Sequence, residues 1–233
     1  MLTKLQPICL FWDHSNLFLS LKRVAKRDDN LFARHNIRID FKNLFSIASA
    51  GRPITKAFCV GSVLSELVGV WKQITKSTGI MPELHELGVD SGREQGVDEC
   101  LQVSMLRCLT DITPPQVVVL LTGDGAGFGN GVGFHSDLQR MYLQGWGVEV
   151  VSWDLACAKS LKTWVKKVGT YIKLEDYYDS VTFIQGGRLS RYPNLANRPV
   201  SLPRAGVQGP EGELKPEATQ EPPNRWGAPR RPT

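Results

Sequence analysis

Short apolar runs alternate with amphipathic segments along most of the chain. Residues 8–12 (ICLFW) and 116–121 (QVVVLL) are apolar almost throughout, which is typical of strands buried on both faces of a sheet. Residues 16–27 instead place apolar side chains three or four positions apart, with basic residues between them, which predicts an amphipathic helix. Ser15 is the expected N-cap of this helix.

The same pattern predicts the remaining elements. Helices are expected at 39–50, 65–77, 98–109, 134–143 and 155–167, strands at 54–60, 81–87 and 148–151, and extended segments at 170–173 and 180–184. Because strands alternate with helices, the crossovers between them are expected to be right-handed. The predicted fold class is α/β, doubly wound, with a mostly parallel sheet covered by helices on both faces.

The composition changes near residue 185. Nine of the 14 prolines lie from Pro193 onward, and residues 185–233 carry eight Lys or Arg against four Glu, so most of the net charge of +5 belongs to this segment. Such a segment buries too little apolar surface to offset its chain entropy. We therefore expect a folded domain at 1–184 and a disordered Pro/Gly/Arg-rich tail at 185–233, in which Trp226 and the Arg230–Arg231 pair could bind a partner.

Five scattered cysteines include no CxxC pair. They are expected to be buried thiols in a reducing, cytoplasmic compartment, and a structural zinc site is not predicted. No apolar run reaches the ~20 residues that cross a bilayer, and the N-terminal residues do not resemble a signal peptide. A membrane location is therefore not expected.

Acidic residues follow the two most apolar predicted strands. Asp13 comes directly after ICLFW, and Asp124 comes three residues after VVVLL. The carboxyl ends of parallel strands meet at one edge of a sheet, where ligands of such folds bind. Asp98 opens the helix that follows a polar, Gly-rich loop and can face the same edge. Each acid alone could be a helix N-cap, but three converging carboxylates call for a hard cation such as Mg²⁺ or Mn²⁺.

Two other ligand-binding folds fit the residues less well. The glycines after Asp124 suggest a dinucleotide-binding loop, but Asn130 stands where the GxGxxG fingerprint needs Gly or Ala. An adhesion domain of the von Willebrand type would place Asp-x-Ser-x-Ser after the first strand. Asp13 and Ser15 fit that pattern, whereas Leu17 occupies its third position.

The segments FWDHSN at the first strand, GVDE at a later helix and VVVLLTGDG at the fourth strand resemble the NYN domain family of PIN-like (LabA-like) nucleases. The resemblance extends over roughly residues 7–175 and includes GWGVEVVSWD. It implies a PIN-like three-layer α/β/α sandwich with a mostly parallel central sheet. It also implies a metal-dependent ribonuclease in which Asp13, Asp98 and Asp124 are catalytic and hold Mg²⁺ or Mn²⁺.

The same resemblance makes single-stranded RNA the expected partner, with Ser15, Asn16, Thr122 and Arg93 as substrate-binding residues. A homodimer remains an open alternative.

One position departs from the family pattern. Many relatives carry a second Asp two residues after the fourth-strand acid, where this chain has Ala126. Asp137 could replace it. The alternative function is therefore a catalytically silent NYN-like module that binds RNA or a protein. For His14, a phosphate donor and a surface residue without a role are both open.

Overall fold

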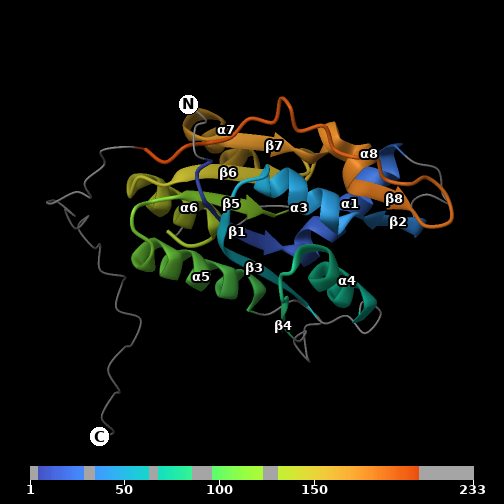
Figure 1. Ribbon diagram of the computed structural model, residues 1–233, viewed down its shortest axis with the longest axis horizontal. Coiled ribbons are helices and arrows are strands. Elements are labelled where there is room, and N and C mark those ends of the chain that lie inside the picture. The colour runs from blue at the N-terminus through green and yellow to red at the C-terminus, as the bar shows by residue number, and fades with distance from the viewer. Residues whose placement is uncertain (1–4, 29–34, 63–67, 86–95, 123–130, 205–233) are drawn as a thin grey trace, which may run out of the picture.

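The computed structural model describes residues 5–28, 35–62, 68–85, 96–122 and 131–204. Within these residues the main strands are β1 (Ile8–Asp13), β3 (Ile54–Ser62), β4 (Glu83–His85), β5 (Val117–Leu121), β6 (Gly147–Ser152) and β7 (Thr170–Lys173). They form a parallel sheet in the order β4-β3-β1-β5-β6-β7 (Figure 1). A small antiparallel sheet pairs β2 (Ile37–Ile39) with β8 (Thr182–Ile184).

Helices cover both faces of the main sheet and make a three-layer sandwich. One face packs against α1 (His14–Asp28), α3 (Phe41–Ser49) and α4 (Val68–Thr78), and the other against α5 (Val97–Asp111), α6 (Phe134–Leu143) and α7 (Lys159–Val168). A 3₁₀ helix, η2 (Leu174–Tyr177), and the short α8 (Tyr178–Val181) lead into β8. None of the helices in the described ranges is long and apolar enough to span a bilayer.

Strand β1 lies in the middle of the sheet, between β3 and β5, and all six of its residues are buried. Its side chains alternate between the two helical layers. Leu10 and Trp12 pack in the core formed with α1, α3 and α4, whereas Cys9 and Phe11 pack in the core formed with α5, α6 and α7. Both faces are therefore apolar, which is why the strand appears in the sequence as an unbroken apolar run.

The order of the strands reverses beside β1. The chain proceeds from β1 to β3 and β4 on one side, then returns to β5 on the other side and continues to β6 and β7. The point between β1 and β5 is thus the topological switch point, and the crevice beyond the carboxyl ends of these two strands is where such folds bind ligands. Asp13 and Thr122 lie at these two ends.

The predicted α/β class is confirmed, as is the mostly parallel sheet between helices. The helix at 134–143 and the extended segment at 170–173 have the predicted bounds. The helix expected at 155–167 begins only at Lys159, because residues 154–156 form a turn after β6. Strand β2 was not predicted: its last residue, Ile39, was expected to begin the helix at 39–50, whereas α3 begins only at Phe41.

The segment 185–204, named here the strap, differs from the expected disordered tail. It runs from β8 back across the molecule, as the orange trace in Figure 1 shows. Asn43 on α3 donates to the backbone carbonyl of Arg191, and the backbone N–H of Arg204 donates to the carbonyl of Gly145. The folded part of the chain therefore extends 20 residues beyond 184, and the rest of the expected tail, 205–233, lies outside the described residues.

A buried ion cluster fixes the strap to the sheet. Glu149 on β6 is fully buried, and its two carboxylate oxygens accept from both terminal nitrogens of Arg52 at 2.7 and 2.8 Å. Arg198 of the strap lies 2.8 Å from the same carboxylate, and the backbone N–H of Ser201 donates to it at 2.7 Å. A buried charge is tolerated only when it is paired and hydrogen-bonded, so the strap completes the environment of Glu149.

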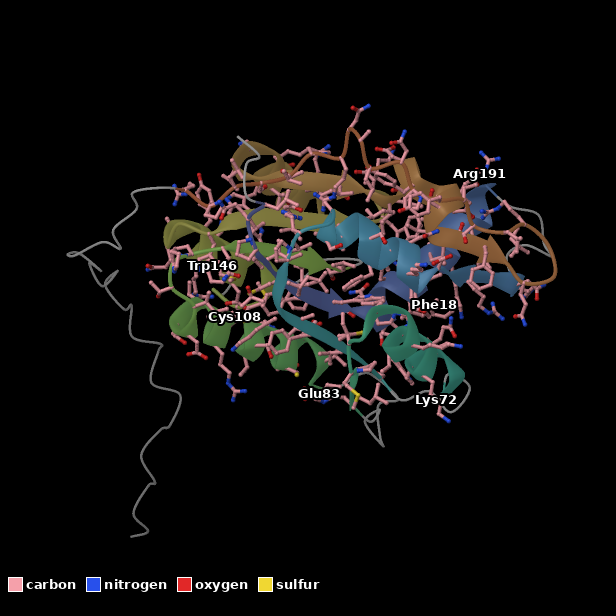
Figure 2. All side chains as sticks on the ribbon, in the orientation of Figure 1. Phe18, Lys72, Glu83, Cys108, Trp146 and Arg191 are labelled. Carbon is pink, nitrogen blue, oxygen red and sulfur yellow. The ribbon has the colours of Figure 1, made fainter. Side chains whose placement is uncertain are left out.

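Replacing Arg198 should therefore destabilise the protein far more than replacing another arginine of the strap. We expect Arg198→Met to lower the free energy of unfolding by about 3 kcal/mol, because it leaves Glu149 with one arginine and frees strap contacts to α3. Arg191→Met is the matched control, since Arg191 is 77% exposed and lies at the surface in Figure 2. Its effect should stay within about 0.5 kcal/mol. Urea denaturation measures both, and equal effects would contradict the role given to the ion cluster.

Candidate active site at the carboxyl edge of the sheet

Asp13 is the last residue of β1 and is 1% exposed. Its Oδ1 accepts from the backbone N–H of Asn16 at 3.1 Å, which is the bond that a helix N-cap makes to the third residue of its helix. Its Oδ2 accepts from the hydroxyl of Thr122 at 3.3 Å. The expected N-cap Ser15 is wrong, because α1 follows β1 without a loop and Asp13 takes that position.

The hydrogen bond between Thr122 and Asp13 crosses the switch point. Thr122 follows β5 directly and is fully buried, and its hydroxyl faces Asp13. A buried hydroxyl with this partner is not available to a phosphate. Thr122 is therefore placed as a residue that orients Asp13, which differs from the substrate contact expected from the sequence.

Ser15 also differs from its expected role. Its Oγ accepts from the backbone N–H of Ser62, the last residue of β3, at 3.0 Å. This bond ties the start of α1 to the neighbouring strand. Asn16 is half-buried and holds Asp13 through its backbone, which matches the orienting role among those expected for it.

Asp98 lies in the first turn of α5, on the helix that covers the same face of the sheet as Asp13. Asp13 shares this face with Cys9 and Phe11, because side chains two residues apart on a strand point the same way. Asp98 is exposed at the N-terminal end of α5, and no side chain caps this helix end. The structure thus brings Asp13 and Asp98 to the same side of the same sheet edge.

The start of α6 lies beside α5. Gln102 is one turn after Asp98 on the same helix face, and its side chain accepts from the backbone N–H of Gly133 at 2.9 Å. Asp137, in the first turn of α6, is 2% exposed. One of its oxygens pairs with Arg140 at 2.7 Å, while its buried Oδ2 has no hydrogen-bond partner.

Burial raises the pKa of Asp137, and the hydrogen bond and charge of Arg140 oppose that shift. A carboxylate in the first turn of a helix is ordinarily exposed to solvent. The sequence shows this acid but not its burial, because the burial depends on how α6 packs against α5 and the sheet.

His14 is neither a surface residue nor a phosphate donor. It is 1% exposed, and its ring lies among the rings of Trp12, Phe41 and Trp71, at centroid distances of 5.6, 5.4 and 5.0 Å. Burial in these apolar surroundings lowers the pKa of His14 to about 3, so the imidazole is neutral in the folded protein at neutral pH. Both interpretations of His14 from the sequence are therefore wrong.

Several predicted residues lie outside the described ranges, namely Asp124, Arg93 and Ala126. Among the described residues, Asp13, Asp98 and Asp137 do not bring three ligand atoms within 4.8 Å of one another. A surface cavity of about 440 Å³ is lined by η2, α8 and part of the strap, and none of the predicted site residues lines it. The candidate site is therefore the strand edge itself, with Asp13 as its fixed point.

The comparisons with known proteins identify the family of the chain and support its fold. The sequence model of the NYN domain family matches residues 7–174, a span that begins just before β1 and ends after β7. The chain belongs to the NYN domain family. NYN domains are part of the PIN-like nuclease superfamily, whose members typically use divalent metal ions. The matched span includes Asp13, Asp98 and Asp124.

A solved structure supports the fold of this NYN domain. It is a protein of unknown function from Vibrio parahaemolyticus, with a TM-score of 0.55 and 15% sequence identity, and the match covers 76% of this chain and 97% of that one. At this identity the likeness concerns the fold alone. No curated protein matches the chain.

The buried His14 of the NYN domain predicts a loss of stability in mild acid. The unfolded chain takes up a proton as the pH falls below about 6.5, whereas the folded protein does so only near 3, so stability falls through this window. At pH 4.5 this amounts to about 2 to 3 kcal/mol for the one site. We expect His14→Phe, which keeps an aromatic ring in place, to remove that part of the acid sensitivity.

Urea denaturation at pH 7 and pH 4.5 measures the effect as a difference between the two pH values. His35→Gln is the matched control, because His35 is exposed and its replacement leaves the ring of His14 buried. The prediction is wrong if the wild type and His14→Phe lose the same free energy between the two pH values.

Proposed function

We propose that this NYN domain is a metal-dependent ribonuclease that hydrolyses phosphodiester bonds of single-stranded RNA at the carboxyl edge of its sheet. The observation that carries the proposal is the placement of Asp13. It is a buried carboxylate at the end of the central strand, at the point where the strand order reverses. Its two oxygens are held by the backbone N–H of Asn16 and the hydroxyl of Thr122, at the crevice where folds of this kind bind ligands.

The donor set fits a hard divalent ion. Asp13 and Asp98 offer carboxylate oxygens on the same side of one sheet edge, and Mg²⁺ and Mn²⁺ prefer such ligands. Asp124, two residues after Thr122, is the third ligand that we propose. The buried, unpartnered Oδ2 of Asp137 adds an oxygen near the start of α6 that could stand in for the acid missing at Ala126.

In this proposal the residues around Asp13 orient its carboxylate and bind the phosphate, and they do not themselves react. The backbone N–H of Asn16 and the hydroxyl of Thr122 hold the two oxygens of Asp13, so the carboxylate does not rotate when substrate binds. The N-terminal turn of α5 presents backbone N–H groups without a side-chain cap, and such a helix end favours a phosphate. A divalent ion, when bound, supplies Lewis-acid stabilisation of the charge that develops on the phosphate.

The two ends of α5 provide the sharpest test. Asp98→Asn removes a proposed ligand at the first turn, whereas Asp111→Asn makes the same change at the last residue of the same helix, where the side chain is exposed. Outer-sphere partners of metal sites are worth about 10- to 100-fold in activity, so loss of a ligand should cost about 100-fold or more. Asp111→Asn should cleave as the wild type does.

Cleavage of end-labelled single-stranded RNA by the full chain is measured with Mn²⁺, with Mg²⁺ and with EDTA. Asp124→Asn and Asp13→Asn should lose cleavage as Asp98→Asn does, while Asp13→Asn also reports on the cap of α1 through its unfolding temperature. If the folded wild-type chain cleaves RNA with neither ion, the proposed ribonuclease activity is refuted.

The second candidate is a catalytically silent module that binds RNA. It is favoured by Ala126 and by the engagement of both Asp13 oxygens within the protein, because capping α1 is itself a reason to keep this acid. RNA binding separates the two. An enzyme variant such as Asp124→Asn keeps RNA binding while turnover is lost, whereas a silent module binds RNA with no turnover in the wild type.

A further inference from the structure

Three side chains of different metal-binding types meet at edge strand β4 of the sheet, and none of them is a ligand proposed for the candidate active site. They are Glu83 and His85 on β4 and Cys100 on α5. Their ligand atoms all lie within 4.8 Å of one another, and they are the only such group of three among the described residues. Figure 2 shows Glu83 at the outside of the molecule, on this edge strand.

The register of the sheet explains why these side chains converge. Val60 on β3 pairs with Glu83 on one side and with Asp13 on the other, and Val60 packs in the core formed with α5. Directly paired residues of neighbouring strands point to the same face, so Glu83 faces α5. His85, two residues on, points the same way and meets Cys100 in the first turns of that helix.

The imidazole of His85 is held with one nitrogen toward Glu83. Its Nε2 is buried and makes no hydrogen bond, although Glu83 Oε1 lies 3.4 Å away. A well-formed hydrogen bond would be nearer 2.9 Å. Two ligands bound about 2.0 to 2.1 Å from a tetrahedral ion lie about 3.4 Å apart, which is the separation found here.

Glycine at position 96 makes room for this ring. A Cβ at Gly96 would lie 3.1 Å from Nδ1 of His85, and the positive φ of +80° at Gly96 is one that side-chain-bearing residues rarely adopt. The start of α5 therefore approaches the Nδ1 side of the ring. This leaves Nε2 directed toward Glu83 and the thiol.

The donor set selects the kind of ion. A thiol sulfur and an imidazole nitrogen suit Zn²⁺, whereas Mg²⁺ and Mn²⁺ prefer oxygen alone. Zinc binds cysteine as the thiolate, so the proton of the Cys100 thiol must leave. Binding of Zn²⁺ releases that proton to solvent and leaves the thiolate as ligand.

We propose that Glu83, His85 and Cys100 form a zinc site that joins the edge strand β4 to the first turns of α5. Three protein ligands leave one position of the tetrahedron for water. None of its three ligands belongs to the oxygen site proposed at Asp13, which lies two strands away in the same sheet, although Cys100 follows Asp98 by two residues on α5. It does not depend on whether the NYN domain cleaves RNA.

Cobalt substitution tests the site directly. The reduced, EDTA-treated full chain is titrated with Co²⁺, and a thiolate-to-cobalt charge-transfer band in the near ultraviolet is expected to saturate at one ion per chain. Cys100→Ser should remove the band. Cys157→Ser, which changes a cysteine outside this cluster, should keep it. Competition with Zn²⁺ then gives the zinc affinity of each variant.

Two further variants test the role of Glu83 and the independence of this site from Asp13. Glu83→Gln changes an exposed side chain that is not needed for packing, and it should raise the Kd for Zn²⁺ by roughly tenfold or more. Asp13→Asn should leave the charge-transfer band unchanged, so a failed ribonuclease proposal does not affect this test. No thiolate band at saturating Co²⁺ in the folded wild type, or a band that survives in Cys100→Ser, would overturn the zinc site.

Discussion

Burial of β1 on both faces is the constraint from which the rest of the structure follows. Its alternate side chains anchor two separate cores, so helices must cover both sides of the sheet. The same alternation decides the environment of its last residues. Trp12 enters the aromatic core that surrounds His14, while Asp13 turns to the face covered by α5. The same strand thus places the buried, neutral His14 beside one core and directs the carboxylate of Asp13 toward the other face.

The elements that the sequence predicts well are those whose signal is local. The unbroken apolar run of β5 and the helical spacing of 134–143 each decide their own structure. Residues whose role depends on a distant partner were missed. Ser15 is bound to Ser62, and Thr122 to Asp13, across strands that only the folded sheet brings together. For Asp13 the sequence offered both roles, helix cap and candidate ligand, and the structure shows the cap through the bond from the backbone N–H of Asn16.

The strap shows that composition alone also fails to predict structure that depends on a distant partner. A segment rich in proline and arginine predicts disorder because it lacks apolar side chains. Residues 185–204 are ordered instead by charge and backbone hydrogen bonds, through Arg198 and Ser201 on the buried Glu149. No local pattern marks Glu149 as their partner, since it lies 49 residues before Arg198 in an otherwise apolar strand.

The end of the strap and the candidate site lie at opposite rims of the sheet. Arg204 bonds to Gly145, just before β6 begins, so the chain continues from the amino rim of the sheet. Asp13 lies at the carboxyl rim, about 20 Å away along a six-residue strand. The chain therefore leaves the described part of the fold at the rim opposite the one that carries Asp13.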